Sequence, residues 1–140
     1  MTSAPAPTTL ITGASGFVGR HLVDAFADRG HTVVAVDVSG KGWRDDVRWE
    51  LGDVRDDVRM TELCEGVDTV IHNASLVHTR RNKEELVWAV NHGGTRNVLA
   101  ACRSAKVGRL VYMSSASVVY EGRDIVEGDE RLPYTSISQA

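Results

Sequence analysis

The feature that most constrains the fold of this chain is a glycine-rich turn between an apolar run and a helical pattern. Residues 8–12 form a short β-branched run, and residues 17–29 then change to the spacing of an amphipathic helix. Between them, Gly13 lets the chain reverse, Gly16 allows the backbone to approach a pyrophosphate, and Gly19 allows helix and strand to pack closely. Because a helix N-terminus offers N–H groups and a positive dipole, the turn predicts an anion site.

The same alternation of strands and helices continues along the chain. It predicts an α/β fold, a Rossmann-type doubly wound parallel sheet with strand order 3-2-1-4-5, flanked by helices. Residues 1–7 are expected to be a disordered tail and residues 8–140 a single domain. The expected strands are 8–12, 32–38, 47–51, 69–72 and 110–113, the expected helices are 17–29, 56–64 and 84–105, and 114–140 is expected to be a loop.

An acidic residue at the end of the second expected strand gives the glycine turn a partner. Asp37 stands 18 residues after Gly19, where a carboxylate can accept hydrogen bonds from an adenosine ribose and repel a 2′-phosphate. This position favours NAD and makes NADP the less favoured cofactor. A solvated turn aspartate is the alternative, and Lys41 and Arg44 stand near enough in sequence to blur the preference.

A second acidic residue ends the third expected strand. Asp53 could accept a hydrogen bond from an adenine amino group, with Val54 supplying a backbone contact. Alternatively, Asp53 or Asp56 simply caps the helix that follows.

Composition disfavours nucleic-acid-binding, membrane-spanning, secreted and metal-binding proteins. Sixteen basic and nineteen acidic residues give a net charge of −3, and the basic residues are scattered, which disfavours a nucleic-acid surface. No apolar run approaches the ~20 residues that span a bilayer, and the first residues do not resemble a secretion signal, so we expect a cytoplasmic protein without a membrane contact. The two cysteines, Cys64 and Cys102, form neither a disulfide framework nor a zinc motif, and no metal site is expected.

Four motifs in order along the chain carry a resemblance to a known family. They are the glycines 13, 16 and 19 at a spacing of three and three, Ile71-His72-Asn73-Ala74-Ser75, Asn91-His92-Gly93-Gly94-Thr95-Arg96-Asn97, and Val111-Tyr112-Met113-Ser114-Ser115. Together they resemble the extended, or atypical, short-chain dehydrogenase/reductase superfamily of the NAD-dependent epimerase/dehydratase type. Residues 114–122, 128–130 and 132–134 look most like its 3β-hydroxysteroid dehydrogenase and sterol-4-carboxylate 3-dehydrogenase branch.

The resemblance implies roles for individual residues. Ser115 would be catalytic, holding the hydroxyl or carbonyl oxygen of a small-molecule substrate, or alternatively its hydroxyl satisfies backbone at a strand end. Asn91 would either contact the cofactor or, as an amide in the interior of its helix, hold neighbouring backbone in place. The full set of expected cofactor-binding residues is Gly13, Ser15, Gly16, Phe17, Val18, Gly19, Asp37, Asp53, Val54, Asn73, Ala74, Ser75 and Asn91.

One family motif is absent from the chain. The family takes the alcohol proton with a tyrosine four residues before a lysine, yet Lys41, Lys83 and Lys106 have no such tyrosine, and Ser138 follows Tyr134 at that spacing. We therefore expect the chain to stop before the acid/base pair and the C-terminal substrate domain, and to bind NAD without turning over substrate.

Three functions follow from these patterns. The first is the NAD-binding part of an oxidoreductase that moves hydride between a secondary alcohol, of the 3β-hydroxysteroid kind, and NAD. The second is an NAD-dependent nucleotide-sugar epimerase or dehydratase. The third is a non-catalytic NAD-sensing module, because such a module would lack the tyrosine and lysine; a homodimer is a possible assembly for any of them.

Overall fold

Five parallel strands form the centre of the molecule. The computed structural model describes residues 4–40, 42–77 and 83–135. The strands are β1 (Thr8–Thr12), β2 (Thr32–Asp37), β3 (Arg48–Leu51), β4 (Thr69–His72) and β5 (Arg109–Tyr112), in the order β3-β2-β1-β4-β5. This order and the parallel pairing confirm the predicted doubly wound sheet.

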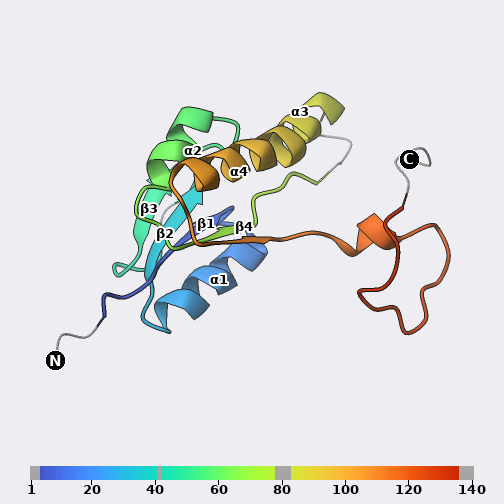
Figure 1. The fold of residues 1–140 in the computed structure, drawn as a ribbon, viewed down its shortest axis with the longest axis horizontal. Coiled ribbons are helices and arrows are strands. Elements are labelled where there is room, and N and C mark those ends of the chain that lie inside the picture. The colour runs from blue at the N-terminus through green and yellow to red at the C-terminus, as the bar shows by residue number, and fades with distance from the viewer. Residues whose placement is uncertain (1–3, 41, 78–82, 136–140) are drawn as a thin grey trace.

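Helices cover both faces of the sheet. Helix α1 (Phe17–Ala27) lies on one face, and α2 (Asp57–Leu63), α3 (Glu84–Trp88) and α4 (Thr95–Ser104) lie on the other (Figure 1). Successive side chains of a strand point to opposite faces, so Leu10 of β1 packs beneath α2 and α4 while Ile11 packs beneath α1. Burial on both faces explains why β2 is apolar without interruption from Val33 to Val36.

Helix α1 ends two residues earlier than the sequence pattern predicts. The turn after Ala27 closes at Gly30, which has φ of +80° and donates its N–H to Ala27 O at 2.9 Å. A left-handed glycine just beyond a helix is a common stop, because glycine adopts this conformation without a steric penalty.

The expected continuous helix over 84–105 is wrong in its centre. A six-residue π-helical segment, Ala89–Gly94, separates α3 from α4. Gly94 lies against Val54, and an added Cβ would overlap the Val54 side chain. Two adjacent glycines, Gly93 and Gly94, weaken the local preference for α-helix, so contacts with other elements decide the geometry here.

The last part of the described chain runs away from the sheet (Figure 1). Beyond β5 the described residues up to Thr135 hold one 3₁₀ turn, Ala116–Val119. Strand β5 is the edge of the sheet, and its Val111 and Tyr112 side chains are exposed. The predicted loop over 114–140 is thus mostly irregular where it is described, and residues 136–140 lie outside the described residues.

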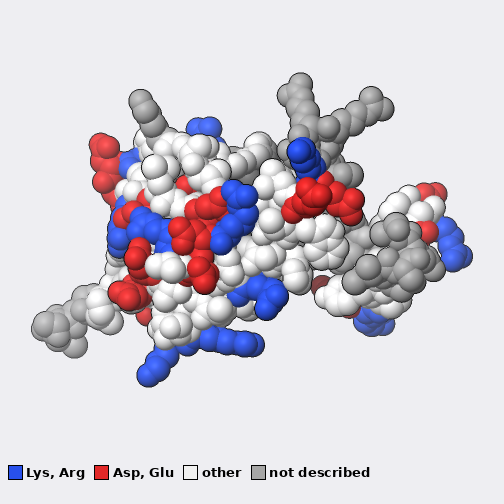
Figure 2. Space-filling model, turned by 90° about the horizontal axis from the view of Figure 1, so that it is seen from above, with Lys and Arg blue, Asp and Glu red and all other residues white. Residues whose placement is uncertain are grey.

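The N-terminal segment and the surface complete the description. Residues 4–7 are exposed and lie outside helix and strand, and Pro7 O accepts the Thr32 N–H at 3.0 Å; residues 1–3 lie outside the described residues. On the face shown in Figure 2, basic and acidic side chains lie interleaved rather than in a basic stripe. Within the described ranges, no helix is long and apolar enough to cross a membrane.

Candidate cofactor-binding site

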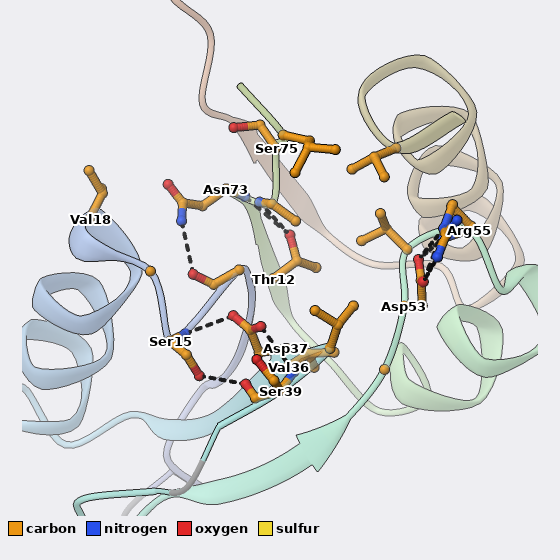
Figure 3. Close-up of a pocket in the computed structure, with 18 of the residues that line it drawn as sticks. Thr12, Ser15, Val18, Val36, Asp37, Ser39, Asp53, Arg55, Asn73 and Ser75 are labelled. Carbon is orange, nitrogen blue, oxygen red and sulfur yellow. Dashed lines mark hydrogen bonds and ion pairs between the residues drawn. The ribbon is translucent and has the colours of Figure 1, made fainter. Parts of the chain in front are cut away.

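The glycine turn joins β1 to α1 at the carboxyl edge of the sheet (Figure 3). Gly13 has φ of +66°, which reverses the chain, and its carbonyl accepts the Gly16 N–H at 3.2 Å. Gly19 sits directly on this turn, and a Cβ there would overlap Gly13 O. The close approach brings the first turn of α1 against the end of β1.

The first turn of α1 presents backbone N–H groups that no side chain caps. Gly16 is its N-cap and supplies no side-chain cap, and the first turn holds no acidic residue. The N–H groups of Phe17, Val18 and Gly19 therefore have no acceptor within the helix. These N–H groups form the positive end of the helix dipole, and the turn that holds them borders a cavity.

Asp37 is bonded to the turn rather than projecting into solvent. Its Oδ2 accepts the Ser15 N–H at 2.9 Å and its Oδ1 accepts the Ser39 N–H at 3.3 Å. The Ser15 hydroxyl donates to Ser39 O at 3.0 Å, which ties the turn to the segment after β2 (Figure 3). Asp37 is half-buried and borders the cavity. The carboxylate that the sequence analysis assigns to a ribose is thus also bonded to the glycine turn.

Asp53 forms a two-pronged ion pair with Arg55. Arg55 Nη2 lies 2.5 Å from Asp53 Oδ2 and Nε lies 3.0 Å from each carboxylate oxygen. This guanidinium lowers the pKa of the Asp53 carboxyl. The cap of α2 is Asp56, whose Oδ1 accepts the Arg59 N–H at 2.9 Å. Asp53 is therefore left at the cavity, and its predicted adenine contact stays a prediction.

One cavity of about 790 Å³ collects most of the expected cofactor residues. Among the expected cofactor-binding residues, Gly19 and Asn91 do not border it, and neither does Ser115, the expected catalytic residue. Residues that the sequence analysis did not select also border the cavity, among them Arg55 and the apolar Leu76, Leu86 and Val90. Leu86 and Val90 are apolar at helical spacing, so from sequence they are indistinguishable from core residues. The expected residues that border the cavity are Gly13, Ser15, Gly16, Phe17, Val18, Asp37, Asp53, Val54, Asn73, Ala74 and Ser75.

Asn91 holds backbone next to the cavity. Its Oδ1 accepts the Leu76 N–H at 2.7 Å, and its Nδ2 donates to Leu76 O at 2.9 Å. Of the two roles left open for Asn91, this geometry corresponds to the second.

Ser115 lies apart from the cavity, on the segment beyond β5. Its Oγ accepts the Ser117 N–H at 3.2 Å and lies 2.8 Å from Ser117 Oγ, so it caps the 3₁₀ turn. The side chain is exposed. The described structure does not bring Ser115 together with the expected cofactor-binding residues, and its catalytic role stays a prediction.

The residues after β4 are fastened to the glycine turn. Asn73 Nδ2 donates to Gly13 O at 3.2 Å, and the Thr12 hydroxyl oxygen accepts the N–H groups of Asn73 and Ala74 at 3.1 Å each (Figure 3). Behind Thr12 lies His72, which is 1% exposed. Burial lowers the pKa of His72 to about 4, so its ring is neutral at pH 7. Sequence reasoning gave Thr12 and His72 no role.

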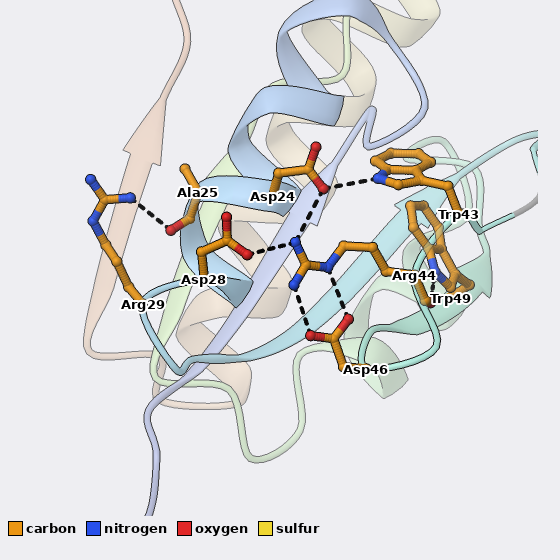
Figure 4. Close-up of polar contacts among 8 residues, drawn as sticks. All are labelled: Asp24, Ala25, Asp28, Arg29, Trp43, Arg44, Asp46 and Trp49. Atoms are coloured by element: carbon orange, nitrogen blue, oxygen red, sulfur yellow. Dashed lines mark hydrogen bonds and ion pairs between the residues drawn. The ribbon is translucent and has the colours of Figure 1, made fainter.

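Arg44 is bonded to acidic residues at the end of α1 and in its own loop (Figure 4). It forms a two-pronged bond with Asp46 at 2.8–2.9 Å, and its Nη1 lies 2.7 Å from Asp28 Oδ1 and 3.5 Å from Asp24 Oδ1. Arg44 does not border the cavity. It is therefore not placed to offset the charge of Asp37; Lys41 lies outside the described residues.

Comparison with known proteins identifies the family of this chain. The sequence model of the 3-beta hydroxysteroid dehydrogenase/isomerase family matches residues 10–140. The chain belongs to this family. The resemblance to the extended short-chain dehydrogenase/reductase superfamily is thereby confirmed.

Individual relatives show how much of a longer protein this family member spans. Human sterol-4-alpha-carboxylate 3-dehydrogenase, decarboxylating, is 41% identical over 124 residues, which are 89% of this chain and 33% of the human protein. A short-chain dehydrogenase/reductase superfamily protein from Agrobacterium tumefaciens with bound NAD superposes with a TM-score of 0.82 at 30% identity, over 91% of this chain and 39% of that one. A UDP-galactose 4-epimerase gives 0.75 at 33% identity, over 91% and 44%. The chain thus spans about a third of the curated relative.

Proposed function

We propose that this chain is the NAD-binding part of a dehydrogenase that acts on a secondary alcohol of the 3β-hydroxysteroid class. The observation that carries the proposal is the meeting of the α1 amides and Asp37 at one cavity. A dinucleotide requires an anion site for its diphosphate and an acceptor for its ribose, and here the Ser15–Asp37 bond sets the two side by side.

The chain's residues fit the separate parts of NAD. The amides of Phe17 and Val18 would hold the diphosphate, and Asp37 retains lone pairs to accept ribose hydroxyls after bonding Ser15 and Ser39. Asp53 and Arg55 border the end of the cavity next to Val54, where the adenine would lie. The solved relative with bound NAD supports this cofactor.

The charge at Asp37 supports NAD over NADP. A 2′-phosphate beside this carboxylate would meet a like charge, and Arg44 is bonded to three carboxylates and does not border the cavity. Among described residues, Arg55 is the only basic side chain that borders the cavity, and it is paired with Asp53.

In the complete protein, NAD held by these residues would supply hydride-transfer chemistry at its nicotinamide. Ser115 would orient the substrate oxygen, and a tyrosine–lysine pair outside this chain would take the hydroxyl proton. The substrate class rests on the family and on the human relative, which is named as a sterol-carboxylate dehydrogenase. We also propose a cytoplasmic location, in line with the two free, buried thiols of Cys64 and Cys102.

Calorimetric titration of the chain with NAD and NADP tests the cofactor. We expect NAD to bind at least about tenfold more tightly than NADP, and Asp37→Asn to remove most of this difference, because the amide keeps an acceptor for Ser15 N–H but loses the charge. Asp45→Ala, an exposed carboxylate outside the cavity, is the matched control and should keep the preference. An unchanged NAD to NADP ratio in Asp37→Asn would show that the ribose assignment is wrong.

The reaction is tested in the full-length protein. Release of NADH on addition of a 3β-hydroxysteroid supports the dehydrogenase. Interconversion of a nucleotide sugar without net NADH would instead identify an epimerase, and NAD binding with neither reaction would identify a sensing module.

A further inference from the structure

A line of hydrogen bonds runs through the interior behind the cavity wall. His72, at the end of β4, lies between a threonine of β1 and a threonine of α4. Its Nδ1 is 2.8 Å from Thr12 Oγ1, and its Nε2 is 2.9 Å from Thr95 Oγ1. The Thr95 hydroxyl continues the line to Asn91 O at 2.6 Å. None of these contacts was selected from the sequence.

The direction of each bond is fixed by the available protons. A carbonyl oxygen can only accept, so Thr95 donates its one hydroxyl proton to Asn91 O. The Thr95 oxygen must therefore accept a hydrogen bond from His72 Nε2–H. The ring is neutral because it is buried, so Nδ1 carries no proton and accepts from the Thr12 hydroxyl. The Thr12 oxygen then accepts the Asn73 and Ala74 N–H groups. A single proton arrangement satisfies every group in the line.

The two ends of this line hold the two ends of one wall. Residues 73–76 all border the cavity. Thr12 fastens the first two of these residues, and Asn91 fastens Leu76 through two bonds. His72 therefore connects the anchor at one end of the wall with the helical turn that carries the anchor at the other end.

We propose that His72, as its Nε2–H tautomer, is a positioning residue for the wall formed by residues 73–76 and, through it, for the nucleotide. The second part rests on the proposed NAD-binding function. His72 does not itself border the cavity, so it acts through Thr12 and Thr95 rather than by contact with the ligand.

Substitution of Thr95 tests the connection. Thr95→Val keeps the shape of the side chain but removes both bonds, whereas Thr95→Ser keeps the hydroxyl. We expect Thr95→Val to weaken NAD binding about tenfold, and to speed hydrogen exchange of the Asn73, Ala74 and Leu76 amides by about tenfold. Thr95→Ser should restore both to within about twofold of the unmodified chain.

Thr61 provides a matched control. Its hydroxyl donates to Asp57 O at 2.8 Å, the same bond to the fourth preceding residue that Thr95 makes, but on α2 and outside the cavity. Thr61→Val should leave NAD binding and exchange of the three wall amides unchanged, because it removes the local bond without touching the line through His72.

Nitrogen NMR of His72 in the unmodified chain gives a readout that does not depend on NAD. We expect the neutral Nε2–H tautomer at pH 7. An Nδ1–H tautomer, a charged ring, or wall amides whose exchange Thr95→Val leaves unchanged would overturn the proposal, and so would faster exchange without weaker NAD binding.

If Thr95→Val does not fold, the His72 tautomer and the NAD-binding constant of Thr95→Ser test the proposal instead, and weak NAD binding by Thr95→Ser would overturn it. If the unmodified chain does not bind NAD, the proposed function fails, while the tautomer and the exchange rates still test whether His72 positions residues 73–76.

Discussion

The side-chain amide of Asn91 lies against the main chain of Leu76 and pairs with it as a neighbouring strand would. Oδ1 accepts the Leu76 N–H at 2.7 Å, and Nδ2 donates to Leu76 O at 2.9 Å. The pair joins the π-helical segment to the loop after β4, across a sequence separation of 15 residues. A substitution here should therefore act on the cavity wall rather than on helix formation.

Asn91→Ala should leave both polar groups of Leu76 without their partner. We expect the free energy of unfolding to fall by about 1–3 kcal/mol, because half-buried backbone groups lose two hydrogen bonds. Urea unfolding followed by circular dichroism measures the change. Arg96→Ala, exposed on α4, serves as control and should stay within about 0.5 kcal/mol of the unmodified chain. An equal loss in both variants would contradict the role of the Asn91–Leu76 pair.

Gly19→Ala should disrupt the glycine turn. The added methyl group would overlap Gly13 O and the Ala14 backbone, and backbone atoms cannot move aside as a flexible side chain can. We expect a destabilisation of at least about 3 kcal/mol and loss of NAD binding. Gly93→Ala is the control, because an added Cβ there meets nothing within 4 Å. Normal NAD binding by Gly19→Ala would show that the turn tolerates a different geometry.

The stability of the chain should fall as pH falls through the range in which His72 titrates. The folded pKa of about 4 lies below the ordinary value of 6.5, so the unfolded chain binds the proton more readily, and stability is complete above pH 6.5 and lost toward pH 4. At pH 5 the contribution of His72 is a loss of about 2 kcal/mol relative to pH 7.5. Urea unfolding at both pH values measures it.

His72→Gln isolates this contribution. Because glutamine does not titrate, the variant should lose less stability than the unmodified chain between pH 7.5 and pH 5, by about the same 2 kcal/mol. Identical pH dependence in the two proteins would mean that other groups cause the acid sensitivity.

Arg44→Ala should leave the choice between NAD and NADP unchanged. The guanidinium is bonded to Asp46, Asp28 and Asp24 and does not border the cavity, so its removal does not alter the charge near Asp37. Parallel titrations with the two cofactors should give a ratio within about twofold of the unmodified chain. A marked shift toward either cofactor would place Arg44 near the ribose after all.

The sequence by itself determined the α/β class, the strand order and the glycine turn. These follow from local rules: a strand buried on both faces is mostly apolar, and a reversal with close helix packing requires glycine. Four of the five strands have at least one end where the sequence pattern placed it, and β1 and β4 agree at both ends. Motif spacing likewise brought most of the expected cofactor residues to one cavity, because the carboxyl ends of parallel strands meet at one edge.

Only the tertiary structure decided how polar groups from distant segments pair. The bonds of Asn91 to Leu76 and the line from Thr12 through His72 to Thr95 join residues 15 to 60 positions apart, and no local sequence pattern predicts them. The π-helical segment was likewise not predicted. The ion pair between Arg44 and Asp28 likewise depends on where the end of α1 and the loop after β2 meet. Periodicity reports which side of an element is buried, whereas the partner of a buried polar group is set by the packing of whole elements.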